Sequence, residues 1–154
     1  MSFKDKFILF FATGFYSGNA PFVPGTFGTL AGIVFAFAFT VIPMPFRGFY
    51  LVSLILAAVY LADQAEKILG KKDPGCIVID EIAGYCVAVS VVPVTAGSLA
   101  AGFFIFRFFD IVKLLPVKYF EDNFPGGAGV VLDDIMAGIL SAVVLKILWA
   151  WAIF

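Results

Sequence analysis

Long apolar stretches are the feature that most restricts how this chain can fold. A helix that crosses a bilayer needs about 20 mostly apolar residues, and the chain contains several such stretches. Hydrophobic residues make up 62% of the sequence and charged residues only 14%, whereas soluble domains carry about 25% charged residues. A water-soluble fold of 154 residues would have to expose many of its 20 phenylalanines. The sequence therefore predicts an all-α, polytopic transmembrane helical bundle that forms one membrane-embedded domain over residues 1–154.

The length of each apolar stretch, and the prolines and glycines between stretches, place the predicted helices. Near the N-terminus, Phe7–Phe15 is too short to cross a bilayer and predicts an interfacial or re-entrant helix. Gly28, Gly32 and Ala36 form a stripe of small residues on the first span; such a stripe lets helices approach closely and would allow two chains to associate. We predict about five spans, at Thr29–Pro45, Gly48–Lys67, Ile77–Val92, Gly97–Leu115 and Val130–Phe154.

Basic residues gather in alternate loops of the predicted bundle. The opposite loops carry only Arg47, and Lys146 lies inside the last span, where it could snorkel to the surface or pair within the bundle. Because lysine and arginine are enriched in cytoplasmic loops, we expect the basic loops and the N-terminus to face the cytoplasm. The basic residues on that side are Lys4, Lys6, Lys67, Lys71, Lys72, Arg107, Lys113 and Lys118.

Acidic residues fall on the same side as the basic loops, although lysine and arginine alone set this topology. Acids near a membrane are costly and usually face a cavity, and grouped carboxylates repel one another unless a cation binds them. Oxygen ligands without histidine or thiolate suit Mg²⁺ or Mn²⁺. The ordinary alternative, charges that merely end helices in the headgroup layer, is favoured for Asp63, Glu66, Glu121 and Asp122. The predicted metal ligands lie within apolar runs and are Asp80, Glu81, Asp110, Asp133 and Asp134.

Two of these acidic pairs are adjacent in sequence, Asp80-Glu81 and Asp133-Asp134. Adjacent residues on a helix diverge by about 100°. We therefore expect one member of each pair to bind the metal and the other to orient water or a neighbouring side chain.

Two further segments could hold a phosphate group at the same depth. Arg107, Asp110 and Lys113 recur at intervals of three and so lie near one helical face. The two cations could bind phosphate oxygens, or Arg107 and Asp110 could simply pair.

The segment PGTFGTL at 24–30 opens the first span. The N-terminus of a helix offers free N–H groups that can bind phosphate, although a helix start packed through glycine explains the segment equally well. Its candidate substrate-binding residues are Gly25, Thr26, Gly28 and Thr29.

Composition excludes several classes of function. The chain has no histidine, which excludes Ser-His-Asp triads, histidine-ligated zinc and a histidine nucleophile. A net charge of −1 gives no basic surface for nucleic acid. Cys76 and Cys86 lie among apolar residues and are best explained as small buried hydrophobes.

Four segments together resemble the phosphatidylglycerophosphatase A family. They are VPGTFGTL at 23–30, GCIVIDEIAG at 75–84, FRFFDIVK at 106–113 and GGAGVVLDDIMAG at 126–138. The resemblance implies an enzyme of the bacterial cytoplasmic membrane, with its active site facing the cytoplasm. Such enzymes use Mg²⁺ to remove the terminal phosphate of phosphatidylglycerophosphate, giving phosphatidylglycerol in phospholipid biosynthesis. The expected partners are therefore this phospholipid and the surrounding membrane lipids.

Combined with the resemblance, the residues suggest a mechanism. Metal held by the five acids would neutralise the phosphate and activate water, with Glu81 as the candidate base and Asp80 and Asp134 as catalytic ligands. Arg107 and Lys113 would stabilise the phosphate oxygens. A phospho-aspartyl route is less supported, because the Asp-x-Asp motif of aspartate nucleophiles is absent. Two alternative functions remain: a divalent-cation transporter, although the acids lie at one end and Lys146 would hinder a cation path, and another phospholipid headgroup enzyme.

Overall fold

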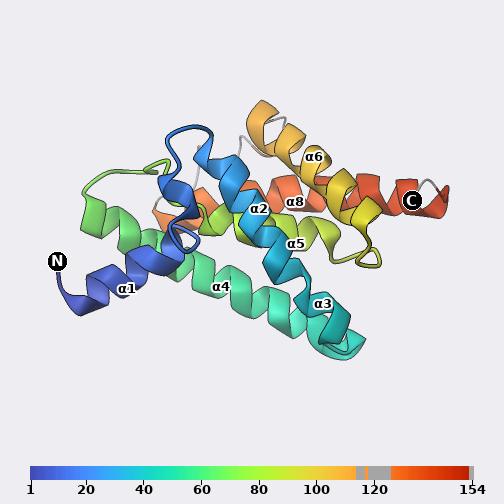
Figure 1. Ribbon diagram of the computed structural model, residues 1–154, viewed down its shortest axis with the longest axis horizontal. Coiled ribbons are helices and arrows are strands. Elements are labelled where there is room, and N and C mark those ends of the chain that lie inside the picture. Colours follow the sequence, from blue (N-terminus) through green and yellow to red (C-terminus); the bar gives the residue numbers. More distant parts are fainter. Residues whose placement is uncertain (114–116, 118–125, 153–154) are drawn as a thin grey trace.

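The computed structural model describes residues 1–113, 117 and 126–152, and this part of the chain is helical throughout its regular elements, with no strand. The predicted all-α membrane bundle is thereby confirmed. Figure 1 shows long helices lying side by side and a shorter N-terminal helix against one end. The elements are α1 (Phe3–Ala12), a 3₁₀ turn (Ser17–Asn19), α2 (Pro24–Ala36), α3 (Ala38–Val41), α4 (Met44–Leu69), α5 (Ile79–Val89), α6 (Ala96–Val112) and α8 (Gly127–Ala150).

Three stretches of the described chain are long and apolar enough to cross a membrane: Pro24–Val41, Met44–Leu69 and Gly127–Ala150. They correspond to the first, second and last of the predicted spans. The third and fourth are shorter than predicted. At a rise of about 1.5 Å per residue, the 11 residues of α5 and the 17 of α6 extend about 17 and 26 Å, against a hydrocarbon core of about 30 Å. Residues Leu115, Lys118 and Phe154 of the predicted topology, and the acids Glu121 and Asp122, lie outside the described residues.

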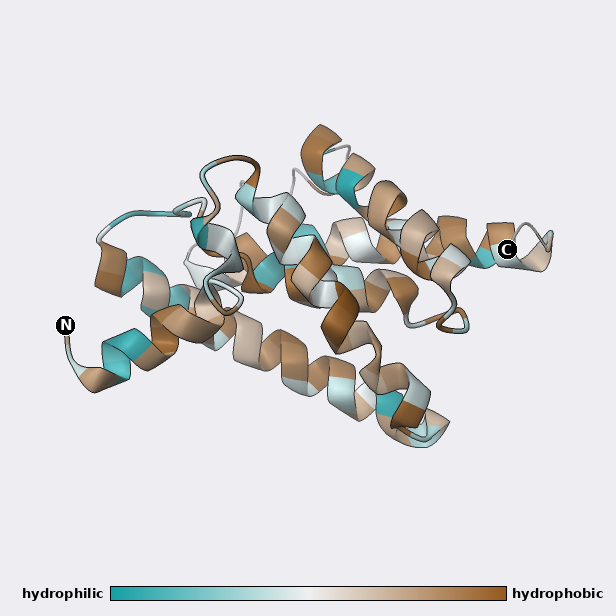
Figure 2. Ribbon diagram, in the orientation of Figure 1, coloured by the Kyte–Doolittle hydropathy of each residue, from teal (hydrophilic) through white to brown (hydrophobic). Residues whose placement is uncertain are grey.

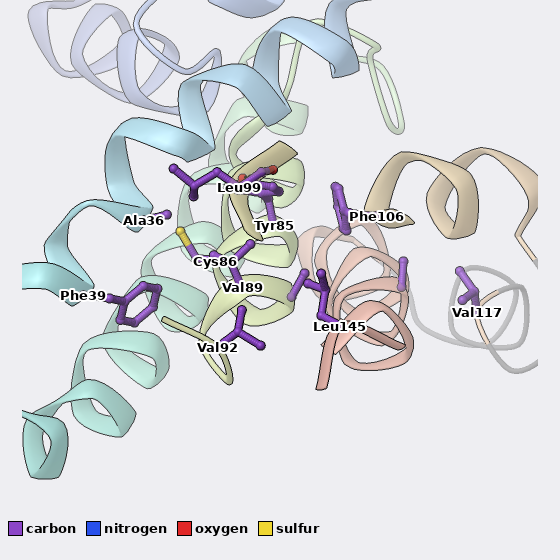
Figure 3. Packing of buried hydrophobic residues seen from close by; sticks show 12 residues of the cluster. Ala36, Phe39, Tyr85, Cys86, Val89, Val92, Leu99, Phe106, Val117 and Leu145 are labelled. Carbon is purple, nitrogen blue, oxygen red and sulfur yellow. The ribbon is translucent and has the colours of Figure 1, made fainter. Parts of the chain in front are cut away.

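The short helix α5 lies at the centre of the bundle, in contact with α2, α4, α6 and α8. Most of its side chains are buried, which explains why an apolar run of this length need not face lipid. In the core, the Tyr85 ring lies edge-on to Phe106 with centroids 6.3 Å apart, and the Tyr85 hydroxyl donates to the Leu99 carbonyl over 2.9 Å. Figure 3 shows Tyr85, Leu99, Phe106 and Cys86 among the buried side chains of this core. Cys86 is buried as predicted, whereas Cys76 is only half-buried.

The small-residue stripe of α2 packs against α5 of the same chain. A Cβ added at Gly28 would lie 2.5 Å from the Val78 Cβ, and one at Gly32 would lie 3.1 Å from the Tyr85 ring. Ala36 is fully buried. Because this surface is occupied within the chain, the stripe gives no support to association of two copies.

Helices α5 and α8 make an equally close contact through Gly84 and Gly138. A Cβ added at Gly84 would lie 2.6 Å from the Asp134 carbonyl oxygen and 2.8 Å from the Phe106 ring, and one at Gly138 would collide with the Gly84 carbonyl oxygen. Only hydrogen fits at these positions, so the two backbones touch directly. This contact fixes how α5 and α8 are placed relative to each other.

The N-terminal helix α1 is 10 residues long, too short to cross a bilayer, in agreement with the prediction of a short helix there. It begins with a capping box in which the Ser2 hydroxyl accepts from the Asp5 N–H and the Asp5 carboxylate accepts from the Ser2 N–H. It packs against α4. Figure 2 shows hydrophilic residues concentrated near this end of the bundle, where α4 ends and α5 and α8 begin.

Candidate active site

A cavity of about 320 Å³ lies where α2, α5 and α8 begin and α6 ends. Three helix N-termini and one C-terminus therefore meet at one end of the bundle. The polar residues of the lining come from three separate stretches of the chain, residues 73–81, 107–113 and 133–134, which the topology brings to a single depth. The lining contains Asp73, Asp80, Glu81, Arg107, Asp110, Lys113, Asp133 and Asp134, together with Val23, Pro24, Gly25, Gly75, Ile77, Ile111 and Val130.

Three carboxylates form a compact cluster in this cavity. Asp80, Glu81 and Asp134 each offer an oxygen, and these oxygens lie within 4.8 Å of one another. Asp80 and Asp134 are buried, and the Glu81 side chain is 15% exposed. Glu81 Oε2 and Asp134 Oδ2 are buried and have no hydrogen-bond partner among the described residues. A buried oxygen without a hydrogen-bond partner destabilises the fold unless something else binds it. The cluster therefore has the oxygen ligands of a divalent-cation site, and, within the described part of the chain, two of its oxygens are free to bind a cation.

The two adjacent acidic pairs behave differently. Asp134 joins the cluster, while Asp133 Oδ2 accepts a hydrogen bond from Lys113 Nζ over 3.0 Å. The two side chains therefore meet different partners, because adjacent residues on a helix diverge by about 100°. In the other pair, both Asp80 and Glu81 offer oxygens to the cluster, because Asp80 stands at the very start of α5 and the first helical turn still faces the cavity.

Arginine and lysine side chains lie beside the carboxylates. Arg107 Nη1 forms an ion pair with Asp110 and lies 3.9 Å from Glu81 Oε1. Arg107 Nε is buried without a partner among the described residues. Lys113 ends α6 with a left-handed backbone, φ 45°, which turns the chain at the edge of the cavity. Asp110, predicted as a metal ligand, thus lines the cavity as the partner of Arg107 rather than as a member of the three-carboxylate cluster.

The start of α2 meets the same cavity through its first turn. Val23 has a left-handed backbone, φ 45°, and Pro24 follows in the first turn of the helix, a position that suits proline. Gly25 lies directly against the acidic and basic side chains: an added Cβ would collide with Glu81 Oε1 and lie 2.8 Å from Arg107 Nη1. The absence of a side chain at Gly25 is what leaves room for Glu81 and Arg107.

The other three substrate-binding candidates of this segment do not line the cavity. Gly28 packs against Val78, and the buried Thr29 hydroxyl donates to the Gly25 carbonyl over 2.9 Å. Thr26 is half-buried. Substrate binding by Thr26, Gly28 and Thr29 stays a prediction that this geometry does not favour, because their environment is that of a packed helix start.

Asp73 lines the cavity although it was not among the predicted residues. It lies in the loop before α5 with φ 44°, and its N–H donates to Glu66 Oε1 over 2.6 Å. In the sequence, only its place beside the Pro74-Gly75 turn, seven residues before Asp80, could have indicated that Asp73 lies near the site. Glu66 therefore supports this loop, which agrees with its interpretation as a structural charge.

Asp63 also has a structural role. It pairs with Lys67 over 2.5 Å on α4 and accepts a hydrogen bond from the Gly127 N–H at the start of α8. Because Gly126 provides no side-chain cap, α4 supplies the cap that α8 lacks. Asp63 thus helps to hold the end of α8 that carries Asp133 and Asp134.

Comparison with known proteins decides which family this arrangement represents. The sequence profile of the phosphatidylglycerophosphatase A family matches residues 10–149. The chain belongs to the phosphatidylglycerophosphatase A family. The phosphatidylglycerophosphatase A of Escherichia coli is 41% identical over 135 residues, covering 87% of this chain and 78% of that protein. The phosphatidylglycerophosphatase A of Haemophilus influenzae is 31% identical over 142 residues, covering 91% and 87%.

A third relative is named for a substrate with a different lipid headgroup. A Bacteroides thetaiotaomicron protein provisionally named phosphatidylinositol-3-phosphatase is 36% identical over 143 residues, covering 88% of this chain and 89% of that protein. No solved structure matches the chain. Membership of the phosphatidylglycerophosphatase A family confirms the prediction of a phosphatase enzyme, and the candidate spans agree with a membrane protein.

Proposed function

We propose that this chain hydrolyses the terminal phosphate of phosphatidylglycerophosphate, giving phosphatidylglycerol and inorganic phosphate. The observation that carries the proposal is the cluster of Asp80, Glu81 and Asp134, whose oxygens lie within 4.8 Å of one another in a cavity also lined by Arg107. Carboxylates beside a guanidinium are the groups that bind a divalent cation and a phosphate together. The names of the Escherichia coli and Haemophilus influenzae relatives support the choice of substrate.

The cluster fits Mg²⁺ by its donor chemistry. Mg²⁺ takes oxygen ligands and commonly uses a few carboxylates plus substrate phosphate, and two of the cluster's buried oxygens have no described partner. We assign Asp80, Glu81 and Asp134 to hold it, with Asp110 and Asp133 at the edge of the same cavity. When bound, Mg²⁺ supplies positive charge against the phosphate and makes water more acidic.

The side chains of the cavity perform the remaining steps. Arg107 pairs with Asp110, and Lys113 pairs with Asp133. Both cations also donate hydrogen bonds to the phosphate oxygens and stabilise the negative charge of these oxygens in the transition state. Water attacks phosphorus and gives its proton to Glu81. The bond from phosphorus to the headgroup oxygen breaks, that oxygen takes up the proton held by Glu81, and phosphatidylglycerol and inorganic phosphate leave.

The rim of the cavity suits a substrate that stays in the membrane. Val23 and Ile111 line the cavity and are 62% and 67% exposed, so apolar side chains border the polar site. Acyl chains can lie against them while only the headgroup enters. The site lies at the end of the bundle that carries the basic loops, which supports a location at the cytoplasmic leaflet of the bacterial inner membrane.

The test is phosphate release from phosphatidylglycerophosphate by the purified full chain in mixed micelles, with Mg²⁺ and then with excess chelator. We expect release that requires Mg²⁺ and that falls when phosphatidate replaces the substrate. A folded sample that releases no phosphate would contradict the proposal. In that case, Mg²⁺ flux into liposomes would test the transporter alternative.

A further inference from the structure

Two adjoining cavities lie at the end of the bundle away from the carboxylates, each of about 360 Å³. They share Ser90, Val91 and Lys146. One is otherwise apolar and lies between α5 and α8, lined by Val87, Ile139, Ala142 and Val143. The other lies between the start of α4, the turn after α5 and the end of α8, lined by Met44, Arg47, Val92, Pro93 and Trp149.

The second cavity brings together two cations that the proposed reaction does not use. Arg47 donates from Nε to the Ile42 carbonyl over 3.2 Å and from Nη2 to the Phe39 carbonyl, so these bonds occupy two of its five N–H donors. Lys146 Nζ donates to the Val91 carbonyl over 3.2 Å. Neither forms an ion pair with a carboxylate of the described chain, and no carboxylate of the described residues lines either cavity.

We propose that these cavities bind one anionic phospholipid of the membrane, with its phosphate at Arg47 and Lys146 and an acyl chain along the apolar cavity. Shape and chemistry agree: the charged and apolar parts adjoin, as the two parts of a phospholipid do. Basic pockets between membrane helices bind anionic headgroups. A zwitterionic lipid is disfavoured because its ammonium group would meet two cations and no described carboxylate.

The depth of the pocket also fits a lipid headgroup. Lys146 follows Asp134 by 12 residues on α8, which corresponds to about 18 Å along the helix axis. This separation is about 60% of the hydrocarbon core of about 30 Å, and the long lysine side chain can extend further toward the far headgroup layer. Trp149 lines the pocket and Trp151 is 74% exposed nearby on the chain. Tryptophans are enriched at the boundary between hydrocarbon and headgroups.

The position of the tryptophans makes the proposal directly testable. The chain has two tryptophans, Trp149 and Trp151, and both lie at this end. Their fluorescence in the full chain, reconstituted in phosphatidylcholine, can be quenched by lipids brominated on the acyl chains. We expect brominated phosphatidylglycerol, which has no phosphate monoester to hydrolyse, to quench at lower mole fraction than brominated phosphatidylcholine, and this preference to weaken with salt.

Substitutions identify the cations responsible. Each basic residue contributes about fivefold to binding of an anionic headgroup, so Lys146→Gln should reduce the preference about fivefold and Lys146→Gln with Arg47→Gln about 25-fold. The matched control removes two exposed lysines of another loop, Lys71→Gln with Lys72→Gln, and should keep the preference. Equal quenching by both lipids in the unmodified chain would overturn the proposal, whatever the variants do, and so would a preference that Lys146→Gln leaves intact. The readout needs no phosphatase activity.

Discussion

Replacing Gly25 with alanine should separate the stability of this protein from its activity. An added Cβ at Gly25 would collide with Glu81 Oε1 and lie 2.8 and 3.1 Å from the two terminal nitrogens of Arg107. All three atoms are the ends of long side chains, which can swing aside without moving a helix. The helix itself gains, because alanine exceeds glycine in helix propensity by about 1 kcal/mol. We therefore expect Gly25→Ala to fold and to be at least as stable as the unmodified chain.

The same movement damages the site. Restoring an ordinary contact requires the Glu81 carboxylate to shift by about 1 Å, and a misplacement of about 1 Å can cost about 100-fold in rate. The terminal nitrogens of Arg107 must move as well, which disturbs their ion pair with Asp110. We expect kcat/KM for phosphatidylglycerophosphate to fall about 100-fold, which corresponds to about 2.7 kcal/mol of transition-state stabilisation.

The assay measures phosphate release with Mg²⁺, together with thermal unfolding of the same samples in detergent. Gly48→Ala is the matched control: Gly48 lies in α4, and an added Cβ there meets nothing within 4 Å. It should keep full activity. A stable Gly25→Ala variant with unchanged kcat/KM would refute the assignment of Glu81 and Arg107 to the reaction, because their ends cannot both stay in place beside a methyl group.

Three further predictions concern the helices that hold the site. Asp134→Asn should abolish the rise in unfolding temperature that Mg²⁺ gives the unmodified chain, which is worth about 2.7 kcal/mol at 100 times the dissociation constant; an equal rise in both proteins would contradict the ligand assignment. Gly84→Ala should destabilise the fold by about 1–3 kcal/mol in thermal unfolding, because its Cβ would lie 2.6 Å from the Asp134 carbonyl oxygen. Asp63→Ala removes the acceptor for the Gly127 N–H and should cost about 1 kcal/mol; unchanged unfolding would show that α8 needs no cap from α4.

Sequence reasoning located the polar end of the bundle because burying charge is expensive. The acids Asp80, Asp110 and Asp134 stand in apolar runs, where a charge usually faces a cavity or a partner, and the structure places all three around one cavity. The basic residues Arg107 and Lys113 lie in the same lining. These placements follow from charge and helix direction alone, which a sequence displays.

What the sequence could not show is which neighbour each side of a helix meets. Gly28 and Thr29 look as suitable for phosphate as Gly25, but the structure shows that Gly28 packs against Val78 and that Thr29 is fully buried. The length of α5 was overestimated for a related reason. Residues 77 and 78 are apolar and buried yet precede the helix, and hydropathy does not distinguish a buried loop from a buried helix.

The glycine contact between α5 and α8 has a consequence for how this site can vary. Asp80 and Glu81 lie on α5 and Asp134 lies on α8. The backbones of these two helices touch at Gly84 and Gly138. The distance between the carboxylates is therefore set by main-chain contact. No side chain of the described residues lies between the two helices at this point, so a change in the size of neighbouring side chains cannot adjust that distance. A relative with a larger residue at either glycine would have to spread its helices and reposition its acids. Across the family, we expect these glycines to be lost only where the carboxylates opposite them are lost too.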